Sequence, residues 1–112
     1  SLNVPKCPEC QRVARPNILM FGDYSWLPKR SSIQEESFDE FLQDNNNKRM
    51  VVIEIGAGSA IPTIRHLSEQ LGQRQQTTVL RINPREPHIR VPHFSFSGGA
   101  VEVLTKIQDT LV

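Results

Sequence analysis

The chain has 112 residues, of which 38% are hydrophobic and 22% are charged, and its thirteen basic and twelve acidic side chains give a formal net charge of +1. This length suits one domain with a single core but is short for a complete dinucleotide-binding enzyme. Neither nucleic acid nor anionic lipid is attracted by a near-neutral chain, and no apolar stretch is long enough to cross a bilayer. We therefore expect a cytoplasmic protein without membrane or direct nucleic-acid partners.

The two cysteines of the chain, Cys7 and Cys10, are separated by a proline and a glutamate. This spacing presents two thiolates to one zinc ion, but a tetrahedral structural site needs four ligands. None of the histidines has a spacing that suggests a partner for the pair. Two interpretations remain open, namely half of a zinc site or two free thiols near a chain end.

Two elements are predicted before the centre of the chain. Residues 17–21 form a short apolar run that is ended by Gly22, which predicts a buried strand followed by a turn. Ser32 and Glu35 have the spacing of a helix-capping box. The apolar residues that recur behind this box at helical spacing are Phe38, Phe41 and Leu42.

The segment from Met50 to Pro62 is the most informative part of the sequence. A β-branched apolar run leads into Gly56, Ala57 and Gly58, and Pro62 suits the first turn of a helix. Such a strand, turn and helix expose backbone N–H groups to an anion or a ribose hydroxyl. The motif is only the front half of the dinucleotide fingerprint, because Ile61 stands in place of its third glycine.

A second strand is predicted over residues 77–82, followed by the polar residues Asn83, Arg85 and Glu86. Ligands of open α/β sheets bind beyond the carboxyl ends of the strands, where a polar residue at the end of the second strand contacts the ribose. The sequence therefore predicts a nucleotide site. An ordinary turn that packs a helix on a sheet explains the same residues and stays open.

The remaining elements complete an α/β pattern. A last short strand is predicted at residues 94–96, and Gly98 and Gly99 open a final helix. Strands that alternate with helices imply a parallel sheet. The apolar positions expected to face the core from the last two helices are Ile64, Leu67, Leu71, Leu104, Ile107 and Leu111.

Two charged residues have unusual positions. Glu54 lies in mid-strand among apolar neighbours, so we expect it to pair with a basic residue from a segment outside this chain. Arg65 lies one turn inside the helix that follows the glycine turn. Its side chain either reaches a phosphate or lies on a solvated helix face, and the second interpretation is favoured.

Five motifs in this order resemble the carboxyl-terminal half of a sirtuin, the family of NAD-dependent protein-lysine deacylases. The motifs are the Cys7–Cys10 pair, the run from Arg15 to Asp23, the turn from Gly56 to Ser59, the Ile82–Asn83 pair and the loop from Gly98 to Ala100. Together they cover nearly the whole chain. Asp23 takes the place of the family's glutamate, and Ala57 the place of its threonine.

The resemblance implies a fold, a function and two cofactors. The fold would be half of a Rossmann-like, doubly wound parallel sheet with helices on its faces (residues 16–112), preceded by part of a zinc-ribbon module (residues 1–15). The chain would contribute the adenosine side of an NAD site and one wall of an acyl-peptide channel. NAD or ADP-ribose, zinc and an acylated protein lysine would then be the partners of the longer protein.

The resemblance also assigns residues. The cofactor-binding residues would be Gly56, Ala57, Gly58, Ser59, Asn83, Glu86, Gly99 and Ala100. The substrate-binding residues would be Phe21, Gly22 and Asp23. The metal ligands would be Cys7 and Cys10.

No catalytic residue is assigned, because the family's histidine-glycine pair has no counterpart in this chain. We therefore expect the isolated chain to be inactive as an enzyme and the longer protein to be active. The alternative is a non-catalytic nucleotide-binding or protein-interaction module with a partial Rossmann fold. Homo-oligomers are compatible with both, since an interrupted sheet leaves an uncovered edge. A zinc ribbon that contacts nucleic acid is disfavoured by the near-neutral charge.

Overall fold

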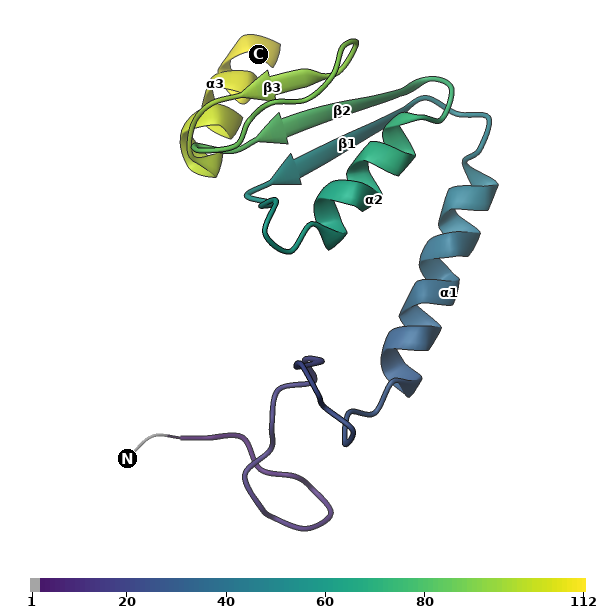
Figure 1. Cartoon of the computed structure of the whole chain (residues 1–112), viewed down its shortest axis with the longest axis vertical. Helices are drawn as coiled ribbons and strands as arrows, with labels where there is room; N and C mark the ends of the chain where they lie inside the picture. The colour runs from purple at the N-terminus through teal and green to yellow at the C-terminus, as the bar shows by residue number, and fades with distance from the viewer. Residues whose placement is uncertain (1–2) are drawn as a thin grey trace. The chain divides into compact units, whose positions relative to one another are not determined.

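The computed structural model describes residues 3–112, which divide into two compact units (Figure 1). The first unit ends at Gln43, and the second runs from Asp44 to Val112. Within residues 3–112, no helix has the length and apolar character that a membrane span needs.

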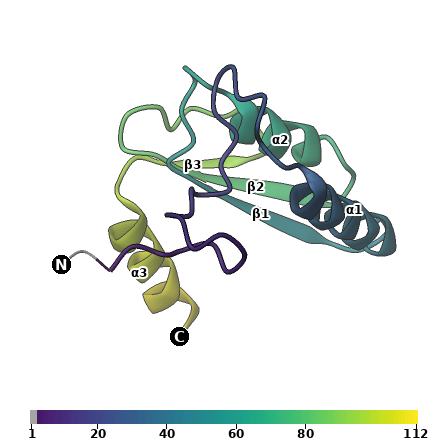
Figure 2. The ribbon, with the colours of Figure 1, turned by 90° about the horizontal axis from the view of Figure 1, so that it is seen from below.

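The second unit is an α/β fold, as the sequence predicts. Its strands are β1 (Met50–Ile55), β2 (Thr77–Ile82) and β3 (Phe94–Phe96), and its helices are α2 (Thr63–Gly72) and α3 (Ala100–Leu111). The strands form one parallel sheet in the order β1-β2-β3. Figure 2 shows α2 and α3 on opposite sides of this sheet. All three strands therefore end at the same edge.

The core of the second unit is small and centres on β2. Val79, Ile82 and Val103 are its buried apolar residues. Along β1 the residues alternate, so that Glu54 is buried beneath α2 whereas Ile53 and Ile55 are about half exposed. This alternation follows from the pleat, because only one face of β1 is covered.

Part of the predicted core is wrong. Ile64 and Leu67 on α2 and Leu111 on α3 are exposed, whereas Ser68 is the buried residue of α2 and Val103 that of α3. The reason on α2 is that the helix face that meets the sheet lies over the polar Glu54, so its packing surface is not its most apolar stripe.

The first unit contains one long helix and little other regular structure. Helix α1 (Lys29–Asp44) begins three residues before the predicted cap at Ser32, and the Ser32 N–H donates to the carbonyl of Pro28 at 2.9 Å. The predicted strand at residues 17–21 is absent, and these residues are irregular and largely exposed. A strand needs a neighbouring strand for its backbone hydrogen bonds, and the described residues offer these none.

Candidate functional site

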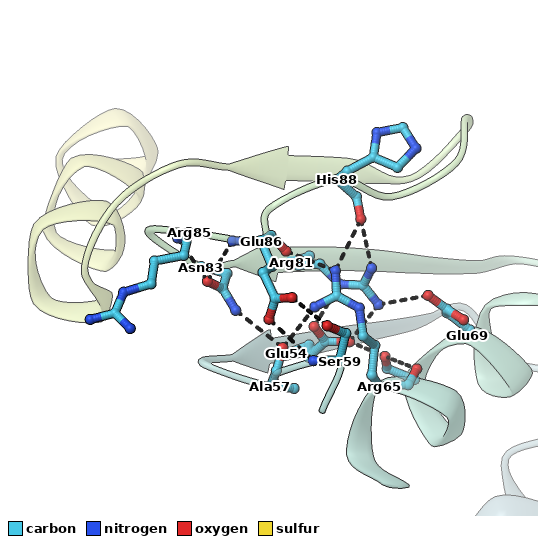
Figure 3. Close-up of polar contacts among 11 residues, drawn as sticks. Glu54, Ala57, Ser59, Arg65, Glu69, Arg81, Asn83, Arg85, Glu86 and His88 are labelled. Carbon is cyan, nitrogen blue, oxygen red and sulfur yellow. Dashed lines mark hydrogen bonds and ion pairs between the residues drawn. The ribbon is translucent and has the colours of Figure 1, made fainter. Parts of the chain in front are cut away.

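The turn after β1 (residues 56–59, the glycine turn) and the polar loop after β2 (residues 83–86, the tip) lie side by side (Figure 3). Strand register places Ile55 next to Ile82, and the Gly56 N–H donates to the Ile82 carbonyl at 3.0 Å. At the next residue of each segment, the Asn83 side-chain amide donates to the Ala57 carbonyl at 3.1 Å. Gly56 has a φ of +67°, a backbone conformation that glycine adopts without steric cost.

Asn83 organises the tip. Its side-chain oxygen accepts hydrogen bonds from the backbone N–H groups of Arg85 and Glu86, each at 2.9 Å. The backbone N–H of Asn83 donates to the Phe96 carbonyl at 3.1 Å. The residue is 5% exposed. Asn83 thus folds its own loop and ties it to the first turn and to β3, which is a stronger structural role than the sequence predicts.

The Glu86 carboxylate accepts both hydrogen bonds that Ser59 donates at the end of the glycine turn. One oxygen accepts the Ser59 backbone N–H at 3.1 Å, and the other accepts the Ser59 hydroxyl. The Ser59 hydroxyl and then the Ser59 backbone N–H lower the pKa of Glu86; desolvation opposes them, and the Arg65 charge adds the smallest lowering effect. Both donors of Ser59 are therefore already bonded within the protein.

Arg65 joins the two loops through their main chains. Its guanidinium donates to the carbonyls of Ala57 and Glu86, at 2.8 Å each, and more weakly to that of His88 at 3.4 Å. The favoured sequence interpretation, a solvated helix face, is therefore wrong. Spacing alone could not reveal this role, because the acceptors are backbone carbonyls from two distant segments.

A buried ion pair lies under the site. The Arg81 guanidinium donates to both oxygens of Glu54, at 2.6 and 2.9 Å, and also to Glu69 at 3.0 Å and to the His88 carbonyl at 2.7 Å. Burial opposes the charge on Arg81, but the hydrogen bonds to Glu54 and Glu69 outweigh it and raise its pKa. The basic partner of Glu54 thus comes from the neighbouring strand and not, as predicted, from outside the chain.

The predicted adenine loop leaves the same edge of the sheet. Gly99 precedes α3 with extended backbone, and its carbonyl accepts the Val103 N–H at 3.1 Å. Ala100 is the first residue of α3. Since β3 ends beside Asn83, the structure brings this third loop to the carboxyl edge that also carries the glycine turn and the tip.

The cysteine pair in the first unit lies in a tight turn. The Cys7 N–H donates to the Arg12 carbonyl at 2.8 Å, and Gln11 closes the turn with a positive φ of 58°. Backbone N–H groups of Cys10 and then Glu9 lower the pKa of the Cys7 thiol, which favours its thiolate. Both thiols are free of disulfide bonds.

These two thiols could supply half of a tetrahedral ligand set. Within residues 3–112, no group of three or more His, Cys, Asp or Glu side chains is placed to hold a metal ion.

The predicted substrate-binding residues form an exposed turn in the same unit. The Asp23 N–H donates to the Met20 carbonyl at 3.2 Å, Gly22 has a φ of +67°, and Phe21 is 94% exposed. The Arg15 guanidinium binds both carboxylate oxygens of Asp23, and this contact lowers the pKa of Asp23. The ion pair fixes the turn that presents Phe21.

No family model, no curated protein and no solved structure matches this chain.

Proposed function

We propose that the chain is the carboxyl-terminal portion of a sirtuin-like, NAD-dependent protein-lysine deacylase and forms the adenosine side of its NAD site. The observation that carries this proposal is the contact between the glycine turn and the Asn83 tip at the carboxyl edge of a parallel sheet. Dinucleotides bind at this edge in half-Rossmann arrangements. The three-stranded parallel sheet flanked by helices is compatible with part of such a fold.

The residues at this edge suit a nucleoside. Glu86 offers carboxylate oxygens to sugar hydroxyls, and the backbone of Gly56 lets a ligand approach closely because it carries no side chain. Gly99 and Ala100 would meet the adenine ring through their backbone. NAD supplies the electrophilic ribose carbon of the family's reaction when it is bound.

This chain would hold the adenosine but not the catalytic base. His66, His88 and His93 lie outside any histidine-glycine pair, and the Nδ1 atom of His93 accepts the Val79 N–H at 3.2 Å within the sheet. We therefore expect the chain by itself to bind ADP-ribose weakly and to leave acetyl-lysine peptides intact. The base and the other zinc ligands would come from the rest of the longer protein.

The first unit would serve the peptide substrate and zinc. Its exposed turn at Phe21 and Gly22 would form one wall of the acyl-lysine channel, where an extended peptide pairs with free backbone. Cys7 and Cys10 would supply two of the four thiolates of a structural zinc site.

The test is NMR mapping of ADP-ribose on the ¹⁵N-labelled chain. We expect the largest shifts at Gly56, Ser59, Glu86 and Ala100, because their N–H groups lie in the three loops of the proposed site. Asn83→Asp removes the amide donor to Ala57 and keeps the acceptor oxygen, so it should weaken binding about tenfold while the sheet stays folded. Arg90→Ala, at an exposed position, is the matched control. Shifts confined to other surfaces would contradict the adenosine site.

A second candidate is a non-catalytic nucleotide-binding or protein-interaction module with a partial Rossmann fold. The observation that favours it is the apolar face of β1, an edge strand on which Val51, Ile53 and Ile55 are 48–62% exposed. Sedimentation of the chain would test self-association through this face. Ile53→Lys should then produce monomers, whereas an unchanged oligomer would exclude this face as the contact.

A further inference from the structure

Helix α1 buries none of its residues. Two of its large apolar side chains, Ile33 and Phe41, are 54% and 55% exposed. A helix of 16 residues is only marginally stable by itself in water, and most helices in proteins are stabilised by packing an apolar face against another element. The described residues therefore leave much of this face of α1 available to a partner.

The charges at the two ends of α1 oppose its helix dipole. Lys29 and Arg30 lie in the first turn, which contains no acidic residue, and Asp44 ends the last turn, which contains no basic residue. A helix is stabilised by the opposite arrangement, with acids near its N-terminus and bases near its C-terminus. Among residues 3–112, neither Arg30 nor Asp44 has an ion-pair partner. The helix thus carries complementary charges at its ends that these residues do not pair.

One face of α1 is complementary to the same face turned end to end. Its residues follow at spacings of three and four, in the order cation, apolar, small, apolar and anion: Arg30, Ile33, Ser37, Phe41 and Asp44. In two copies placed antiparallel, Arg30 would lie against Asp44 of the other copy. Ile33 would lie against Phe41, on either side of a central pair of Ser37 residues. The Ser37 hydroxyl already donates to the Ile33 carbonyl at 3.0 Å, so its burial would leave no donor unsatisfied.

We propose that α1 is a dimerisation helix whose partner is α1 of a second copy of this chain, packed antiparallel about a two-fold axis at Ser37. A two-fold interface must be self-complementary, whereas a parallel pair would place Arg30 against Arg30 and Asp44 against Asp44. A groove of about 690 Å³, lined in part by Arg30 and Ile33, would receive Phe41 of the second copy. This interface is independent of the proposed NAD site and uses a different face from self-association through β1.

The experiment is sedimentation velocity of the chain over about 1–300 μM, because a single helix pair buries less surface than most stable dimers and should associate in the micromolar range. We expect a reversible dimer. Arg30→Glu and Asp44→Arg should each weaken it at least about tenfold, because like charges then meet at both ends of the helix pair. Both changes agree with the helix dipole, so α1 should stay folded by circular dichroism. Asp39→Arg, exposed on the opposite face of α1, is the matched control and should dimerise like the original chain.

Recovery of binding distinguishes the contact from a loss of folding. An equimolar mixture of Arg30→Glu and Asp44→Arg should form mixed dimers about as tightly as the original chain, because each residue 30 then meets an opposite charge at residue 44. A monomeric original chain throughout this range, single variants that dimerise unchanged, or a mixture that stays monomeric would each overturn the proposal. An equal loss in Asp39→Arg would also overturn it, because net charge would then be the cause. A dimer that Ile53→Lys dissociates and Arg30→Glu leaves intact would assign the contact to β1 instead.

Discussion

Replacing Arg81 by methionine should strongly destabilise the second unit. Arg81 is 1% exposed and binds both oxygens of Glu54, which is 3% exposed. In Arg81→Met the Glu54 carboxylate keeps only the hydroxyl of Ser68 among the partners described, and the His88 carbonyl loses its nearest donor. A buried negative charge would then remain without a counter-charge.

The expected loss of folding free energy comes from leaving the Glu54 carboxylate buried without its cationic partner. Removing one member of a buried ion pair costs about 3–5 kcal/mol, because the remaining charge has lost its water and has no partner. A domain of this size is stable by only about 5–15 kcal/mol, so the variant should be marginally folded. In the double variant Glu54→Met, Arg81→Met no charge is stranded, and most of the loss should be recovered.

Urea unfolding followed by circular dichroism, with hydrogen exchange of the Val79 and Ile82 amides as a local probe, measures both effects. These amides lie in β2, so their protection reports on the second unit alone. A loss below about 1 kcal/mol in Arg81→Met would refute the reasoning. A double variant that is no more stable than Arg81→Met would show that the charge of Glu54 is not the source of the cost.

Three further outcomes are expected. Gly72→Ala should destabilise the chain by about 1–3 kcal/mol in thermal unfolding, despite the better helix propensity of alanine. The reason is that the new Cβ would lie 2.9 Å from a Val79 methyl and 2.8 Å from the His93 ring. A gain in stability would contradict this packing. The lowered pKa of Asp23 means that its contribution to stability is present above the ordinary aspartate value of about 3.9 and is lost as pH falls through the folded-state pKa. In an NMR titration, Arg15→Met should move the Asp23 pKa back up, and an unchanged pKa would exclude the ion pair as its cause. Cys7→Ser should abolish zinc binding in the longer protein, whereas equal zinc content in the variant would remove Cys7 from the ligand set.

The parallel pairing of β1 and β2 could be predicted because both strands are rich in β-branched residues, end at a turn and are joined by a helix. The turn at Gly56 and the tip at Asn83 could likewise be expected to meet, since parallel strands in register deliver their carboxyl ends to one edge. The strand predicted at residues 17–21 is wrong because the sequence of one segment does not show whether it has a pairing partner. An apolar run predicts a strand only when another strand is available beside it, and a single segment does not contain that information.

The site is held together by contacts that no local pattern encodes. Arg65 binds carbonyl groups, which every residue possesses, so neither its helical position nor its neighbours in the sequence identify the acceptors. Glu54 is different, because a carboxylate in mid-strand does signal a cationic partner, and strand register then selects Arg81 as the residue directly opposite. A buried acid on one strand is therefore best matched first to its cross-strand neighbour, and only afterwards to a residue outside the chain.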